Sequence, residues 1–145
     1  MAEPMSAQDR LDVMDVLGRY PFCLDSPNVE GLAEVFAPDA VLEGIGGSFA
    51  GIEAIFGWAR GLIAGGRVGA SPPQLVHFVG LPFIEGDGER CSARTYSVIL
   101  TYDEAKQITV PLVGSYEDAF VKKDGRWRIQ KRIIRGDLGR APSRD

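Results

Sequence analysis

Apolar residues recur at helical spacing near the start of the chain. They stand three or four residues apart, at Leu11, Met14, Leu17, Tyr20 and Leu24. This spacing predicts a helix that begins near Ser6 or Ala7. Pro21 falls inside the pattern. Because proline has no N–H and clashes with the preceding turn, we expect it to kink or end the helix.

Two more helices and a short strand are predicted before the middle of the chain. A Ser-Pro pair opens residues 26–36 in the manner of an N-cap followed by a proline, which indicates a second helix. Residues 39–45 alternate as a strand does. Apolar spacing predicts a third helix over residues 51–65, and residues 66–73 form a loop of Gly, Ser and Pro.

The second half of the chain has the alternation and turn residues of strands. We expect strands over residues 75–85, 91–102, 107–122 and 127–135. Gly114 is a candidate bulge in the third of them. Helices followed by a run of antiparallel strands are typical of an α+β fold, in which helices cover one face of a curved sheet. Such a sheet tends to enclose an apolar pocket for a small ligand.

Charge and composition exclude several classes of function. The chain has 16 Lys and Arg against 20 Asp and Glu, a formal charge of −4, which argues against nucleic acid or an anionic membrane as a partner. Its one histidine, His77, is too few for the multi-histidine metal sites of zinc and non-haem iron enzymes. No phosphate loop or nucleophile elbow is present, so we expect no cofactor and no metal.

The cysteines and the N-terminus indicate a location. Cys23 and Cys91 have no partner at a metal-ligand spacing, so we expect reduced core residues and a cytoplasmic protein. The first 17 residues are acidic, unlike a signal peptide. No apolar stretch reaches the length of about 18 residues that a membrane span needs.

Two residues are candidates for acid–base chemistry. His77 shares a strand face with Leu75 and Val79, which suits either a core histidine bonded to a carbonyl or a general base. Asp25 follows an apolar run, where an aspartate often caps the next helix. Held against a histidine, it would instead orient the ring and stabilise its charged form. The sequence alone leaves open whether the two touch.

The last strand carries a candidate for charge stabilisation. Alternation places four polar residues on one face, namely Arg126, Arg128, Gln130 and Arg132. We expect a solvated basic face for Arg126 and Arg128. Arg132 lies deeper, beside an Ile-Ile pair, and could face the pocket and stabilise an anion there. Arg94 is a weaker candidate of the same kind.

Motifs along most of the chain resemble those of a known family. They are Arg19-Tyr20, Leu24-Asp25, Phe36-x-x-Asp39-Ala40, Gly51-x-Glu53-Ala54-Ile55, His77 and Asp124-Gly125-x-Trp127. Together they resemble the SnoaL-like branch of the nuclear transport factor 2-like superfamily. The resemblance implies one domain over residues 1–145, with a frayed tail from about 137. It also implies an α+β cone, in which three helices wrap a curved antiparallel sheet around an apolar pocket.

The likeness extends to enzymes of this superfamily. Two motifs are similar to those of hexachlorocyclohexane dehydrochlorinases, Glu43-Gly44-Ile45-Gly46 and Val76-His77-Phe78. The Asp–His dyad of those enzymes falls on Asp25 and His77, and their last-strand arginine falls on Arg132. They have a lysine where this chain has Tyr20, whereas the scytalone and bile acid dehydratases combine tyrosine with an Asp–His pair. Tyr20 therefore favours loss of water or another oxygen-linked group.

From this resemblance we expect a cofactor-independent lyase that performs a dehydratase-like β-elimination on a small apolar or aromatic substrate. His77 would take the proton, and Asp25 would orient its ring. Tyr20 would hydrogen-bond the leaving group or a carbonyl, and Arg132 would stabilise the developing negative charge. The expected pocket walls are Phe36, Leu42, Phe56, Tyr96, Val98 and Tyr116.

Two alternatives remain at this stage. An isomerase or polyketide-type cyclase would use the same dyad without expelling a group. A non-catalytic binding or assembly module, such as the small subunit of ring-hydroxylating dioxygenases, would need no dyad. The resemblance also implies a homo-oligomer, a dimer or trimer paired through exposed sheet faces.

Overall fold

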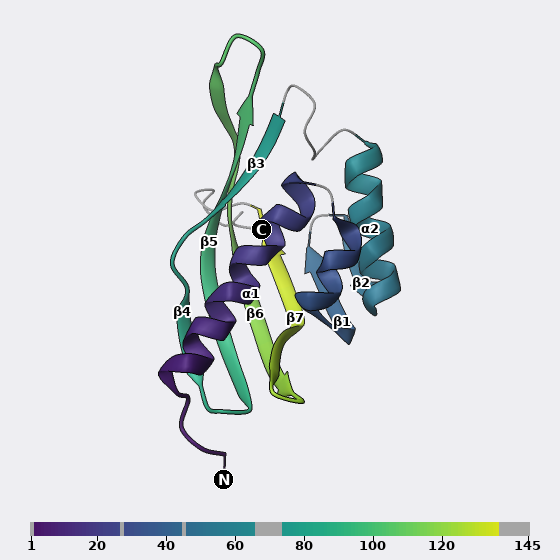
Figure 1. Ribbon diagram of the computed structural model, residues 1–145. Helices are drawn as coiled ribbons and strands as arrows, with labels where there is room; N and C mark the ends of the chain where they lie inside the picture. Colours follow the sequence, from purple (N-terminus) through teal and green to yellow (C-terminus); the bar gives the residue numbers. More distant parts are fainter. Residues whose placement is uncertain (1, 27, 45, 66–73, 137–145) are drawn as a thin grey trace, which may run out of the picture.

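A capping box starts the first helix. The Ser6 hydroxyl accepts a hydrogen bond from the Asp9 backbone N–H, and the Asp9 carboxylate accepts one from the Ser6 N–H. The helix, α1, runs over Ala7–Asp25, which confirms the predicted start. In the computed structural model, which describes residues 2–26, 28–44, 46–65 and 74–136, α1 lies over one face of a sheet (Figure 1).

Pro21 does not end α1. The helix continues past it to Asp25, and the Ser26 N–H still closes the last turn on the Phe22 carbonyl. Proline removes one helical hydrogen bond near the C-terminus. The burial of Tyr20 and Leu24 on either side of it offsets that loss. The helix therefore extends to Asp25, which lies at its C-terminal end next to the buried residue Leu24.

The predicted second helix is much shorter than expected. Its residues form a 3₁₀ helix, η1, over Val29–Glu34, capped by the Asn28 side chain rather than by Ser26. Strand β1 begins immediately afterwards and spans Phe36–Gly44. Pro38 biases the residue before it toward extended backbone, so a helix cannot continue through this segment.

The next elements complete the helical side of the molecule. Strand β2, Gly47–Ala50, pairs antiparallel with β1 as a short hairpin that the sequence pattern had not predicted. Helix α2, Ile52–Ala64, follows at the predicted position. It packs against η1, β1 and β2. Residues 66–73, expected as a loop, lie outside the described part of the chain.

The remaining strands follow the predicted order, with one of them divided. They are β3 (Gln74–Val79), β4 (Phe83–Gly86), β5 (Arg90–Tyr102), β6 (Ile108–Lys123) and β7 (Arg126–Arg135). The predicted strand over 75–85 is two strands because Pro82 lacks the N–H that a continuous ladder requires. Beyond the body of the sheet, β5 and β6 project as a long hairpin (Figure 1).

The fold is α+β, as predicted, but the sheet is mixed rather than purely antiparallel. In the described part of the chain its strands run β2-β1-β7-β6-β5-β3, with β4 also paired to β5. β1 runs parallel to β7, with Leu42 opposite Arg132, and the other pairs are antiparallel. The predicted frayed tail, from about 137, lies outside the described residues.

A bulge in β7 changes which of its side chains face inward. The pairing with β6 slips by one residue at Gln130, because Phe120 is opposite Ile129 and Ala119 is opposite Lys131. Trp127 and Ile129 are buried before the slip, and Arg132 is buried after it. The simple alternation predicted for this strand was therefore wrong, although Arg132 does point inward.

Gly114 is not a bulge. It pairs regularly with Ser97, and the described irregularities of β6 lie elsewhere. Glycine is required there for another reason. A Cβ at this position would lie 2.2 Å from the backbone oxygen of Arg135, where no side chain fits.

Asp9 ties the start of α1 to the sheet. Its carboxylate is buried and accepts hydrogen bonds from the Trp127 indole N–H and the Lys122 ammonium, both at 2.9 Å. It also accepts from the Ser6 hydroxyl at 2.7 Å. These donors, with Lys122 the largest contributor, lower the pKa of Asp9 well below its ordinary value.

Candidate functional site

Asp25 and His77 are in direct contact. The imidazole Nδ1 of His77 lies 2.6 Å from Asp25 Oδ1, and the backbone N–H of His77 donates to Asp25 Oδ2 at 2.8 Å. Both side chains are largely buried, with 7% of the His77 and 13% of the Asp25 side chain exposed. The last residue of α1 is thereby joined to the middle of β3.

This contact defines the state of the imidazole. A carboxylate can only accept hydrogen bonds, so Nδ1 of the neutral ring carries the proton and Nε2 has a free lone pair. Because the backbone N–H holds the second carboxylate oxygen, Asp25 cannot rotate away from the ring without losing both bonds. The pair therefore has the geometry of an oriented general base.

His77 lines a cavity of about 340 Å³. Its apolar wall comes from α2 and four strands and includes Trp58, Leu62, Leu75, Ile99, Leu112 and Ile134. The polar side chains on it are few, Tyr20, His77, Ser97, Tyr116 and Arg135, and the last of these is paired with Glu117 at 2.8 Å. A mostly apolar cavity with a few convergent polar groups is typical of a site for a small organic ligand.

Two tyrosines that line this cavity pack against each other. The rings of Tyr20, from α1, and Tyr116, from β6, are packed edge to face with centroids 5.6 Å apart. The Tyr20 ring also lies 6.5 Å from the His77 ring. Burial raises the pKa of both phenols, so both hydroxyls remain protonated at neutral pH and can act as hydrogen-bond donors.

Arg132 lies behind the tyrosines rather than on the cavity wall. It is fully buried, and its Nε and Nη2 donate to the two carboxylate oxygens of Asp118 at 2.7 and 2.8 Å. Burial alone would lower the pKa of Arg132, but the charge of Asp118 more than offsets this and raises it. The prediction that Arg132 faces the pocket directly needs correction, because Tyr20 and Tyr116 stand between it and the cavity.

The predicted pocket walls divide into four groups, of which the last is Tyr96 and Val98 on β5. Tyr116 lines the cavity. Phe36 and Leu42 are buried in the core, with the Phe36 ring 6.1 Å from that of Tyr20, and neither reaches the cavity. Phe56 is partly buried on α2 under the guanidinium of Arg60, and it does not line the cavity either.

Tyr96 and Val98 were predicted on the wrong face of β5. The Tyr96 side chain is 71% exposed on the outer face, and Val98 has the same parity along the strand. The inward residues of β5 have the other parity and are small over most of its length, Cys91, Ala93, Thr95 and Ser97. The bulky aromatic residue therefore faces outward, where there is room for it.

Sequence reasoning missed Trp58, Leu62, Ser97 and Ile99. Trp58 and Leu62 are four residues apart on α2, so helical periodicity places them on one face. Ser97 and Ile99 lie two residues apart on β5, opposite Val79 and His77 respectively. Pairing with the histidine strand was the signal that could have identified the latter two.

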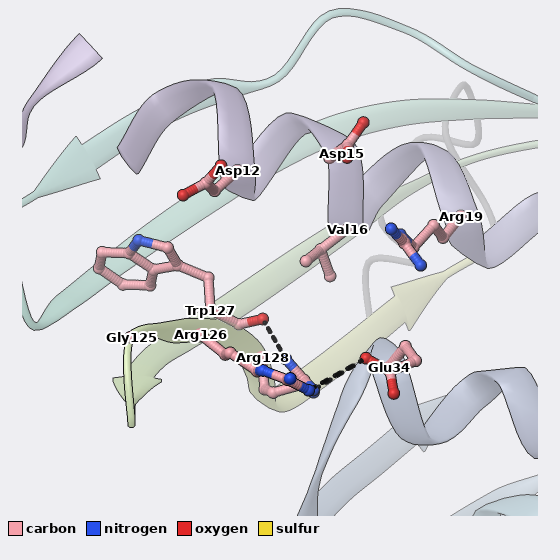
Figure 2. Close-up of a pocket in the computed structure, with 9 residues that line it drawn as sticks. All are labelled: Asp12, Asp15, Val16, Arg19, Glu34, Gly125, Arg126, Trp127 and Arg128. Atoms are coloured by element: carbon pink, nitrogen blue, oxygen red, sulfur yellow. Dashed lines mark hydrogen bonds and ion pairs between the residues drawn. The ribbon is translucent and has the colours of Figure 1, made fainter. Parts of the chain in front are cut away.

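A second depression lies between α1 and the turn that joins β6 and β7. Figure 2 shows that charged side chains dominate it, among them Asp12, Asp15, Arg19 and Glu34. Glu34 is paired there with Arg128 at 3.0 Å and with Arg126 at 3.9 Å. These are exposed ion pairs on an open surface, and they lack the convergent, buried polar groups of the Tyr20–His77 cavity.

The described residues form neither a group of metal ligands nor a membrane-spanning helix. Among the residues that the structure describes, no three His, Cys, Asp or Glu side chains are grouped as they would be around a metal ion. Within that same part of the chain, none of the helices has the length and apolar character required to cross a bilayer.

Comparisons with known proteins place this geometry in context. The family model described as a SnoaL-like domain matches residues 5–133. A relative in Mycobacterium tuberculosis, the uncharacterised protein Rv2910c, is 26% identical over 129 residues, which cover 86% of this chain and 83% of the relative.

Two solved structures share the fold. LinA, a dehydrochlorinase, superposes with a TM-score of 0.74 at 18% identity, over 90% of this chain and 87% of its own. A candidate scytalone dehydratase from Novosphingobium aromaticivorans superposes with a TM-score of 0.73 at 19% identity, over 92% and 95% of the two chains. At these identities the likeness concerns the fold.

Proposed function

Because the chain belongs to the SnoaL-like domain family, we propose that it is a cofactor-independent lyase acting on a small apolar or aromatic substrate. One observation carries the proposal. Asp25 holds His77 through both carboxylate oxygens at the wall of an apolar cavity. The dehydrochlorinase and candidate dehydratase among the structural neighbours support a reaction of this class.

The proposed reaction begins at Nε2 of His77. This nitrogen takes a proton from a substrate carbon, and the electron pair of the broken C–H bond forms a new C=C bond. The group on the adjacent carbon departs with its bonding electrons. Asp25 stabilises the imidazolium that forms. A positioned general base of this kind contributes about 10²–10⁴-fold to the rate.

Tyr20 is the proposed donor to the departing group. Its hydroxyl is protonated, and its ring lies beside that of His77. A phenol can hydrogen-bond a leaving oxygen or an adjacent carbonyl, which suits loss of water. The surrounding aliphatic side chains and Trp58 favour a ring-sized apolar substrate.

An isomerase with the same dyad is the second candidate, because the geometry of Asp25 and His77 supports proton removal whether or not a group leaves. A screen with two sets of substrates separates the two. β-Hydroxy ketones and β,γ-unsaturated ketones of one and two rings are incubated with the protein, and with His77→Ala as the blank. Loss of one water from a β-hydroxy ketone, read by mass spectrometry, supports the lyase. Conversion of a β,γ-unsaturated ketone to its conjugated isomer, read by ultraviolet absorbance, supports the isomerase. No turnover of any member favours a binding module.

The proposed oligomer is a dimer or trimer formed through the outer face of the sheet. Large apolar side chains are exposed on it, namely Phe78, Leu81, Phe83, Tyr96 and Val113. Contiguous exposed apolar side chains of this kind usually mark an interface. The two cysteines are buried and free, which supports the proposed cytoplasmic location, where thiols remain reduced.

A further inference from the structure

The guanidinium of Arg132 lies in the corner formed by two nearly perpendicular aromatic rings. Its central carbon lies 4.3 Å from the ring centroid of Tyr20 and 4.0 Å from that of Tyr116. Both distances are well inside the range of about 6 Å for a cation–π contact. On its edge, Asp118 accepts two parallel hydrogen bonds and fixes the plane of the group.

This cluster of four side chains has a cavity side and a hidden side. Tyr20 and Tyr116 line the cavity, whereas Arg132 and Asp118 do not. Arg132 and Asp118 have no exposed side-chain surface. A ligand in the cavity can therefore touch either phenol, but it cannot reach the guanidinium that lies against both of them.

The buried Arg132–Asp118 pair costs free energy of folding if its only role is to fill the core. Nη1 of Arg132 is buried and has no hydrogen-bond partner among the described residues. An unsatisfied buried donor is destabilising, and apolar side chains of similar volume often stabilise a core more than a buried ion pair does. Such a cost favours a role for the charge itself.

We propose that Arg132 is a positioning residue that acts on a cavity ligand only through Tyr20 and Tyr116. Its charge polarises both phenols, which makes their hydroxyls stronger hydrogen-bond donors toward the cavity. Its plane, fixed by Asp118, holds the two rings in place. Tyr116 thereby becomes a second donor beside Tyr20. The effect of Arg132 on the acidity of the two phenols does not depend on the proposed function. The reaction that the phenols would assist rests on it.

Several charged and titratable side chains surround the two phenols in the described part of the chain. Arg132 and Asp118 lie behind the rings, His77 and Arg135 line the cavity with them, and Asp25 is bound to His77. Burial raises the pKa of Tyr20 and Tyr116, and the charge of Arg132 acts in the opposite direction on both. Asp118 raises the pKa of each phenol and so partly cancels the arginine.

The tyrosine count makes this testable without a substrate. The chain has four tyrosines, of which Tyr96 and Tyr102 are exposed and the other two are buried. In the Tyr96→Phe/Tyr102→Phe background, labelling with 3-fluorotyrosine leaves two ¹⁹F resonances, which Tyr20→Phe and Tyr116→Phe assign. Their change with rising pH reports the acidity of each phenol.

The expected shifts have opposite signs. Asp118→Asn makes both phenols more acidic, because the arginine loses its counter-charge. Arg132→Met makes them less acidic. If Arg132→Met alone does not fold, the double variant Arg132→Met/Asp118→Asn removes both charges. It should still make the phenols less acidic, because the guanidinium is in direct contact with the rings and Asp118 lies on its far edge. Shifts of the same sign in both variants, or no shift, would overturn the proposal.

A kinetic comparison tests whether the arginine acts through the tyrosines. With a substrate from the screen above, Arg132→Met/Asp118→Asn should lower kcat by about tenfold to a hundredfold and leave KM nearly unchanged. In the Tyr20→Phe/Tyr116→Phe background the same change should have little further effect. A full additional loss there would mean that Arg132 acts on the ligand itself. If no substrate is found, the proposed function fails and the fluorine titration still decides this inference.

Discussion

Both carboxylate oxygens of Asp25 are bound to one residue, His77, one through the ring and one through the backbone N–H. The ring bond alone would fix the tautomer. The backbone bond also fixes the position of β3 relative to the end of α1, because it ties the carboxylate to the strand itself. The geometry of the pair is therefore set by the packing of two elements, and not by side-chain rotamers alone.

The first prediction concerns this pair. His77→Ala should lower kcat by about 10²–10⁴-fold, and Asp25→Asn should have a smaller effect in the same direction. Long-range ¹H–¹⁵N NMR can follow the imidazole without ambiguity, because the chain has one histidine. The wild-type ring should be protonated at Nδ1, and Asp25→Asn should populate the other tautomer.

The matched control for the pair is Arg126→Gln. Arg126 is exposed in the charged depression of Figure 2, far from the cavity lining. Its substitution should leave turnover unchanged. Equal turnover by wild type and His77→Ala would contradict the dyad mechanism.

Asp9 should make the stability of the fold sensitive to acid. Its folded-state pKa lies below the ordinary value of 3.8. Its stabilising effect is therefore complete above that value and is lost as the pH falls below it toward the folded-state pKa. Thermal unfolding followed by circular dichroism should show a lower Tm for Asp9→Asn at neutral pH. The difference from wild type should shrink in acid, and a pH-independent difference would exclude this linkage.

Two glycines should respond to alanine in opposite ways. Gly114→Ala should destabilise the protein by about 1–3 kcal/mol, because the new methyl group would meet the backbone of Arg135. Gly57→Ala should stabilise it by about 0.5–1 kcal/mol, because Gly57 is inside α2 and has open space around it. Urea unfolding midpoints measure both, and a stable Gly114→Ala protein would be inconsistent with the close approach of β6 and β7.

The outer face of the sheet should control the oligomeric state. Phe78→Glu/Tyr96→Glu places two charges on exposed apolar positions, so the proposed dimer or trimer should dissociate to monomer without loss of the fold. Light scattering after size-exclusion chromatography gives the mass directly. Glu53→Lys on the exposed side of α2 is the control and should leave the mass unchanged. A wild-type protein that is monomeric at high concentration would rule out the interface.

Periodicity predicted most of the fold. Residue chemistry singled out Asp25 and His77 but left open whether they touch, and the family resemblance is what paired them; the structure places them in contact. The error over Tyr96 had a physical cause. The closely packed inner face of β5 is built mostly from small residues, so the bulky Tyr96 side chain lies on the outer face.

Other features had no local signal. The slip at Gln130 depends on the pairing of two strands, so alternation within β7 could not reveal it. The parallel pairing of β1 with β7 joins segments far apart in the chain. The position of Arg132 behind the tyrosines depends on α1 lying over the sheet, which only the assembled fold determines.

The bulge in β7 has a consequence for redesign. Before it, the inward side chains Trp127 and Ile129 fill the core, and Trp127 is anchored to Asp9. After it, Arg132 packs against the tyrosine rings and Ile134 lines the cavity. A single strand is thus divided into an upstream segment that belongs to the core and a downstream segment beside the cavity. Substitutions that reshape the cavity can be made at the downstream end while the upstream end is left to keep the protein folded.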